Sequence, residues 1–164
     1  MSGTRTAMLS ENQLTLGSFE VAGRCYALDV AQLREIVRWQ PPTPLPRAPA
    51  LIEGVIDVRG VIVPVIDLGR ALGVEAVRSG ARSRIAIAEL DGLVVGLAVD
   101  AALEVLSVEA GALGDPPALA TQAGYAMARA LVRRAGAEPI PVLALEQILE
   151  SVYRSSLSNP EATL

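Results

Sequence analysis

The chain has no histidine and no lysine, so all 14 of its basic residues are arginines. Without histidine it can form no Ser–His or Cys–His nucleophile pair and offers no imidazole to a metal ion. Without lysine it has no P-loop lysine, no Schiff base and no lysine general base. These absences exclude many common catalytic designs and favour a protein that works through contact surfaces.

Cysteine and aromatic residues are also scarce. The single cysteine, Cys25, has no internal disulfide partner, and we expect it to be a small core side chain. Only five residues are aromatic and the net charge is −4, which argues against a nucleic-acid partner. We expect no cofactor and no metal ion, because no spacing among the acidic residues specifies a site.

Long apolar runs are absent as well. No run approaches the roughly 18 residues of a membrane span, so we expect no direct membrane insertion. The N-terminal segment has no apolar signal-peptide core, which predicts a non-secreted, soluble protein.

The residues that are present indicate a compact β protein. The 164 residues are 51% hydrophobic, enough for one domain or two small lobes. About ten short β-rich runs follow one another, separated by turn signals and only short helices. The pattern predicts an all-β fold of two small barrels packed side by side, with the groove between them as the default binding surface. We expect a flexible arm at 1–13, a single domain of two β lobes at 14–153 and a tail at 154–164.

Several local elements can be predicted. Ala22-Gly23 and Asp91-Gly92 mark hairpins between the runs 14–21 and 24–28 and between the runs 84–90 and 93–99. Further strands are expected at 100–108, 125–133 and 140–145, a loop at 109–124, and helices at 29–38, 67–72 and 146–153. The proline-rich segment 40–49 is expected to be a stiff connector, although its Pro-x-x-Pro spacing would also suit an SH3-type ligand.

The predicted helix at 29–38 carries the first candidate contact residue. Asp29 resembles an N-cap, and Leu33, Ile36 and Val37 follow at helical spacing, so Glu35 should be at least partly exposed. Glu35 could be an ordinary solvated charge, or it could pair with Arg38 three residues later.

The stretch from Gly54 to Asp67 contains the second candidate. Two β-branched runs meet at Arg59-Gly60, where Gly60 can adopt the positive φ that a tight reversal needs. Arg59 places a permanently charged group with five donors at this corner. The combination indicates a displayed contact.

Several segments stand in a characteristic order along the chain. They are Ala27-Leu28-Asp29-Val30, Leu33-Arg34-Glu35-Ile36, Pro44-Leu45-Pro46-Arg47-Ala48-Pro49, the run from Gly54 to Leu68, the run from Val94 to Asp100, and Val105-Leu106-Ser107-Val108. Together they resemble the CheW family of bacterial chemotaxis coupling proteins. The resemblance extends from about Leu16 to Val152.

The resemblance implies a fold and a function. The fold would be two SH3-like five-stranded β-barrels that share a core, and the protein would have no enzymatic activity. It would couple the cytoplasmic hairpin tips of chemoreceptors (methyl-accepting chemotaxis proteins) to the histidine kinase CheA. It would bind the kinase's regulatory domain, join rings in signalling arrays, and reach membrane receptor clusters only through its partners. The pathway could be flagellar, or a parallel one controlling pili or a second messenger. The alternative hypothesis from a different class is a carboxylate-dependent enzyme or a ligand-binding barrel on the same fold.

The resemblance also assigns contact residues. Glu35, Arg59 and Gly60 match family positions where substitution affects receptor or kinase contact. Asp57 stands where the family usually has asparagine, and it could engage the Arg59 guanidinium. The expected partner-binding residues are Leu33, Glu35, Asp57, Arg59, Gly60 and Ile85, with Leu33 and Ile85 as apolar residues flanking the groove.

Overall fold

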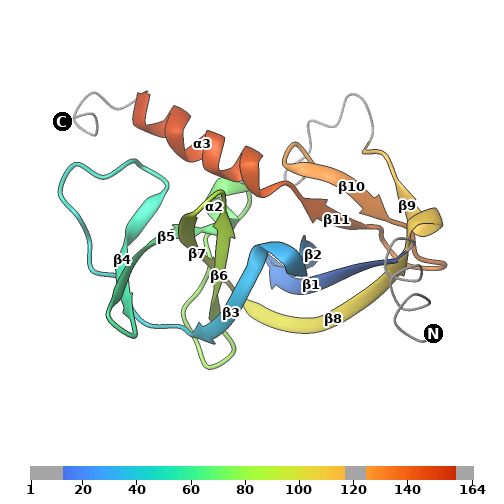
Figure 1. Ribbon diagram of the computed structural model, residues 1–164, viewed down its shortest axis with the longest axis horizontal. Coiled ribbons are helices and arrows are strands. Elements are labelled where there is room, and N and C mark those ends of the chain that lie inside the picture. Colours follow the sequence, from blue (N-terminus) through green and yellow to red (C-terminus); the bar gives the residue numbers. More distant parts are fainter. Residues whose placement is uncertain (1–12, 117–124, 158–164) are drawn as a thin grey trace, which may run out of the picture.

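The computed structural model describes residues 13–116 and 125–157, which form two β-sheets and one long helix (Figure 1). The predicted arm, apart from Gln13, and the last part of the predicted tail, 158–164, lie outside the described residues. Within the described ranges, no helix is long and apolar enough to cross a membrane.

The first lobe is a six-stranded sheet with the order β8-β1-β2-β11-β10-β9. Its strands come from both ends of the chain: β1 (Gln13–Val21), β2 (Arg24–Asp29), β8 (Ala101–Glu109), β9 (Leu113–Gly114), β10 (Ala128–Val132) and β11 (Ile140–Leu143).

The second lobe is a five-stranded sheet with the order β3-β6-β7-β5-β4. Its strands are β3 (Leu33–Arg38), β4 (Ile52–Val58), β5 (Val61–Asp67), β6 (Arg84–Leu90) and β7 (Leu93–Val99). This lobe is one continuous segment inserted between β2 and β8 of the first lobe. The predicted all-β fold with two lobes is confirmed.

A shared core joins the two lobes. Phe19 and Leu28 of the first lobe pack in one buried cluster with Ala86 and Leu97 of the second, and Ile148 of the helix α3 (Leu145–Leu157) completes it. Each lobe also has a smaller cluster of its own. Burying an aliphatic or aromatic side chain contributes about 1.5–3 kcal/mol, so the shared cluster is a large part of the stability of both lobes.

Three hairpins are closed by the same two-residue turn. In Ala22-Gly23, Arg59-Gly60 and Asp91-Gly92, both residues have positive φ, between 50° and 85°. This geometry matches the right-handed twist of the paired strands, and glycine supplies it without steric strain at the second position. The predicted turns at all three positions are confirmed.

The predicted helix at 29–38 is wrong. Asp29 does cap a turn, because its Oδ1 accepts a hydrogen bond from the Ala31 N–H at 2.9 Å. The turn, η1 (Val30–Gln32), is a single 3₁₀ turn, and the chain then continues as β3.

A β-bulge explains the error. Leu33 pairs with Ala88, whereas Glu35 already pairs with Ile87, so Arg34 is an extra residue in β3. The bulge places Leu33 and Ile36 on the same face although they are three residues apart. Their spacing therefore imitates the periodicity of a helix.

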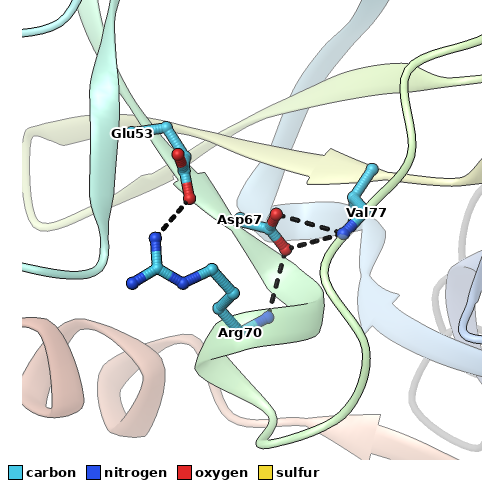
Figure 2. A network of polar contacts seen from close by, with 4 residues as sticks. All are labelled: Glu53, Asp67, Arg70 and Val77. Atoms are coloured by element: carbon cyan, nitrogen blue, oxygen red, sulfur yellow. Dashed lines mark hydrogen bonds and ion pairs between the residues drawn. The ribbon is translucent and has the colours of Figure 1, made fainter.

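The segment after β5 follows the prediction. Asp67 caps the short helix α2 (Leu68–Ala71), and Gly73 ends it with φ of 75°. Figure 2 shows the Asp67 carboxylate between two backbone N–H groups, that of Arg70 at 3.1 Å and that of Val77 at 3.0 Å from the nearer oxygen. The Arg70 guanidinium reaches Glu53 of β4 at 2.7 Å. Burial raises the pKa of Asp67.

Other boundaries differ from the prediction. Helix α3 continues to Leu157, so residues 154–157 are helical and do not belong to a tail. Strands β10 and β11 are shorter than expected, and the expected loop at 109–124 contains η2 (Ala110–Ala112) and β9; its residues 117–124 lie outside the described ranges. In the connector at 40–49, Thr43 forms a β-bridge with Val55.

Candidate partner-binding surfaces

The side chain of Asp57 stabilises the turn between β4 and β5. Its Oδ1 accepts a hydrogen bond from the Gly60 N–H at 2.6 Å, which holds the reversal. The expectation that Asp57 engages the Arg59 guanidinium is wrong, because that guanidinium pairs with another carboxylate. Asparagine has an acceptor oxygen at the same place, so either residue can hold this turn.

The Arg59 guanidinium forms a bidentate ion pair with the carboxylate of Glu35 in β3. Nη1 donates to Oε1 at 2.9 Å and Nη2 donates to Oε2. The proposed local pair between Glu35 and Arg38 is therefore wrong. The strand order makes β3 and β4 the two edges of the second-lobe sheet, so the ion pair joins these edges across the mouth of the lobe. The Arg59 guanidinium holds the pKa of Glu35 below its ordinary value.

A small pocket of about 170 Å³ opens beside this ion pair. Arg34, Glu35 and Arg59 form its polar side. Its apolar lining includes Val58 and Val61. Val61 is 56% exposed and the next residue, Ile62, is 60% exposed. The "barrel mouth", defined here as Glu35, Arg59, Val61 and Ile62, is thus an exposed surface with apolar and charged parts.

The opposite face of β3 forms a second surface, at the junction of the two lobes. A Cβ atom on Gly17 of β1 would lie only 2.7 Å from Leu33 Cδ1, so Leu33 packs directly on the backbone of the first lobe. Gly17 pairs with Val105 of β8, which is 70% exposed. Ile36 lies on the same face of β3 as Leu33 and is also exposed. We call Leu33, Ile36 and Val105 the "inter-lobe surface".

The structure separates the six residues expected from the sequence. Glu35, Arg59 and Gly60 meet at the barrel mouth, with Asp57 supporting them. Leu33 lies on the inter-lobe surface and is half-buried. Ile85 is fully buried in the core of the second lobe, so it supports β3 from beneath and does not flank a groove as expected.

Sequence reasoning missed Ile36, Val61, Ile62 and Val105 as exposed apolar residues. The run from Val61 to Ile66 is apolar throughout, so it contains no alternation that would mark which side chains face outward. The bulge in β3 likewise hides the outward position of Ile36.

A cleft of about 720 Å³ lies between the first hairpin and the loop 75–83. Asp100, between β7 and β8, connects its walls. Its Oδ2 accepts from the Ala22 N–H at 2.8 Å, and its Oδ1 accepts from the Arg78 N–H at 3.0 Å. Asp57, Asp67 and Asp100 therefore each hold backbone N–H groups. Among the described residues, no group of three or more His, Cys, Asp or Glu side chains could hold a metal ion.

Comparisons with known proteins agree on one family. The family model described as the CheW-like domain matches residues 16–153. The chain is 32% identical to the chemotaxis protein CheW of Rhizobium meliloti (strain 1021) over 139 residues, which cover 85% of this chain and 89% of that protein. It is 37% identical to the chemotaxis protein CheW of Bacillus subtilis (strain 168) over 99 residues, covering 60% of this chain and 64% of that protein.

A solved structure is similar too. The crystal structure of the scaffolding protein TtCheW from Thermoanaerobacter tengcongensis superposes with a TM-score of 0.75 at 31% identity. The match covers 84% of this chain and 92% of that one.

Proposed function

The chain belongs to the CheW-like family, and we propose that it is a non-enzymatic adaptor that couples chemoreceptors to a CheA-type histidine kinase. Such an adaptor must hold two partners at once through separate surfaces. It would act in the cytoplasm and reach receptor clusters at the membrane through these partners.

One observation carries the proposal: the two faces of β3 belong to two different surfaces. Glu35 faces the barrel mouth, whereas Leu33 and Ile36 face the inter-lobe surface. The bulge at Arg34 allows one short strand to serve both. An enzyme would need convergent polar groups in one concave site, whereas the charged and apolar groups here are divided between two surfaces.

We assign the inter-lobe surface to the receptor. It combines Leu33, Ile36 and Val105 at the junction of two lobes, and an amphipathic helix binds such apolar surfaces through residues spaced three or four apart. The barrel mouth combines a charged pair with the exposed apolar residues Val61 and Ile62, which suits the β-barrel lobe of a kinase regulatory domain or of a second adaptor in a ring. Arg59 would supply directional hydrogen bonds there.

The test separates the two surfaces by one variant in each. Receptor-containing membranes, the CheA-type kinase and the purified protein are mixed, and kinase autophosphorylation and co-sedimentation are measured. The parent protein should bind both partners and change the kinase rate. Val105→Asp should abolish binding to the receptor, because it puts a charge on the apolar part of the inter-lobe surface. Arg59→Glu should weaken kinase binding by about 1–3 kcal/mol if the contact is desolvated.

Arg129→Glu is the matched control for the charge reversal. Arg129 lies exposed on β10 of the first lobe, a strand that contributes no residue to either surface, and its reversal should change binding to neither partner. If the parent protein sediments with neither partner and leaves the kinase rate unchanged, the adaptor proposal fails.

A further inference from the structure

Two arginines face each other at the end of β3. Arg38 pairs directly with Arg84 of β6 in the antiparallel register, so both side chains project from the same face of the sheet. Among the described strand pairs, this is the one that sets two like charges opposite each other. Such a pair destabilises a sheet, and it occurs here in a chain with net charge −4.

Neither charge is neutralised by a carboxylate among the described residues. Arg84 Nη1 donates to two backbone oxygens, of Ala81 at 2.9 Å and of Ser83 at 2.8 Å, which holds the guanidinium in place. Arg38 is exposed and forms none of the ion pairs found in the described ranges. By contrast, Arg34 and Arg59 of the same lobe are both paired with glutamates.

The arginine pair continues the inter-lobe surface. Ile36 and Arg38 are two residues apart in a regular part of β3, so they share the face that also carries Leu33. The surface therefore runs from apolar residues at the lobe junction to two positive charges at its end. Arg84 is held by one nitrogen, which leaves the remaining edge of its fork for an acceptor.

We propose that the Arg38–Arg84 pair binds an acidic side chain of the partner helix that docks on the inter-lobe surface. The helix would place apolar residues over Leu33, Ile36 and Val105 and an aspartate or glutamate one or two turns further on, beside the two arginines. The carboxylate removes the repulsion between the guanidinium groups, so the charge pair selects both the orientation and the sequence of the helix. This inference rests on the proposed adaptor function.

The experiment measures the affinity of the purified protein for a soluble signalling-domain fragment of a chemoreceptor from the same organism. Arg38→Ala should weaken binding about three- to tenfold at low salt, with a smaller loss at high salt, because exposed charges are screened. Arg38→Lys should retain most of the affinity because it keeps the charge. The melting temperature of Arg38→Ala should be unchanged or higher, since the substitution relieves a repulsion. If Arg38 had a purely structural role, its replacement would lower the melting temperature.

Arg129→Ala on β10 is the matched control and should leave affinity and its salt dependence unchanged. If Val105→Asp abolishes binding while Arg38→Ala binds the fragment as tightly as the parent protein, the proposed function stands and this inference is overturned. If the parent protein does not bind the fragment, the adaptor function and this inference fall together.

Discussion

Asp57 and Glu35 both contribute a carboxylate to the β4–β5 corner, and each takes a different partner there. Asp57 accepts from the Gly60 N–H, and Glu35 accepts from the Arg59 guanidinium. The difference follows from distance along the chain: a carboxylate three residues before the N–H of a tight turn can close that turn locally. Glu35 comes from another strand, so its bond to Arg59 links β3 to the corner.

The pairing of Glu35 gives a prediction about pH. Arg59→Ala should raise the pKa of Glu35 toward its ordinary value, because in the parent protein the Arg59 guanidinium lowers this pKa. Since the folded-state pKa is lowered, the pair's contribution to stability is present above the ordinary pKa of glutamate. It is lost as the pH falls through the lowered folded value. A carbon-13 NMR titration of the Glu35 carboxyl group measures the shift.

Arg34→Ala is the control for that titration. Arg34 also lowers the pKa of Glu35, but through space and less than Arg59 does, so its removal should produce a smaller change. Equal Glu35 titration curves in the parent protein and in Arg59→Ala would contradict the ion pair.

At the scale of elements, β3 shows how far the sequence could be read. Hairpins with glycine in the second turn position were predictable, because their φ requirement restricts the residue type. The strand structure of residues 33–38 was not predictable, because a bulge changes the in–out alternation within a strand and leaves no residue signature of its own. The pairing of Glu35 with Arg59 could not be predicted either, since it depends on two sheet edges that approach each other only in the rolled sheet.

The connector at 40–49 owes its position to one glycine. A Cβ atom on Gly54 of β4 would lie 2.3 Å from the Thr43 carbonyl oxygen. This close approach allows the two Thr43–Val55 backbone hydrogen bonds, at 2.8 and 2.9 Å. The prolines of the connector stiffen it, and Gly54 makes room for it.

Gly54→Ala should therefore be destabilising. The added methyl group must push the connector away from β4, at a cost of about 1–3 kcal/mol. Urea unfolding measures this loss. Gly80→Ala is the matched control, because a Cβ atom at Gly80 meets nothing within 4 Å, and its effect should stay within about 0.5 kcal/mol. Equal losses in the two variants would mean that the close approach at Gly54 is unimportant.

At the scale of the whole molecule, the shared core makes the two lobes one cooperative unit. Leu97 of the second lobe is fully buried in the cluster that also contains Phe19 and Tyr26 of the first. Neither lobe can expose its part of this cluster without exposing the other's. We expect both lobes to unfold in one transition.

Leu97→Ala tests this coupling. The cavity should cost about 2–5 kcal/mol and shift the unfolding of both lobes to lower urea by the same amount. Fluorescence of Trp39, which packs against the core of the second lobe, reports on that lobe, and the NMR signals of Tyr26 report on the first. Two separate midpoints would show that the lobes unfold independently.

The insertion of one lobe within the other also sets an order of events during synthesis. When Val99 has left the ribosome, every strand of the second lobe has been made, whereas β1 and β2 still lack their sheet neighbours β8 and β11. The first hairpin can meanwhile lay Phe19 and Leu28 against the finished lobe, which then serves as a template. Because β11 lies parallel beside β2, one of the last strands to be made fixes the place of one of the first.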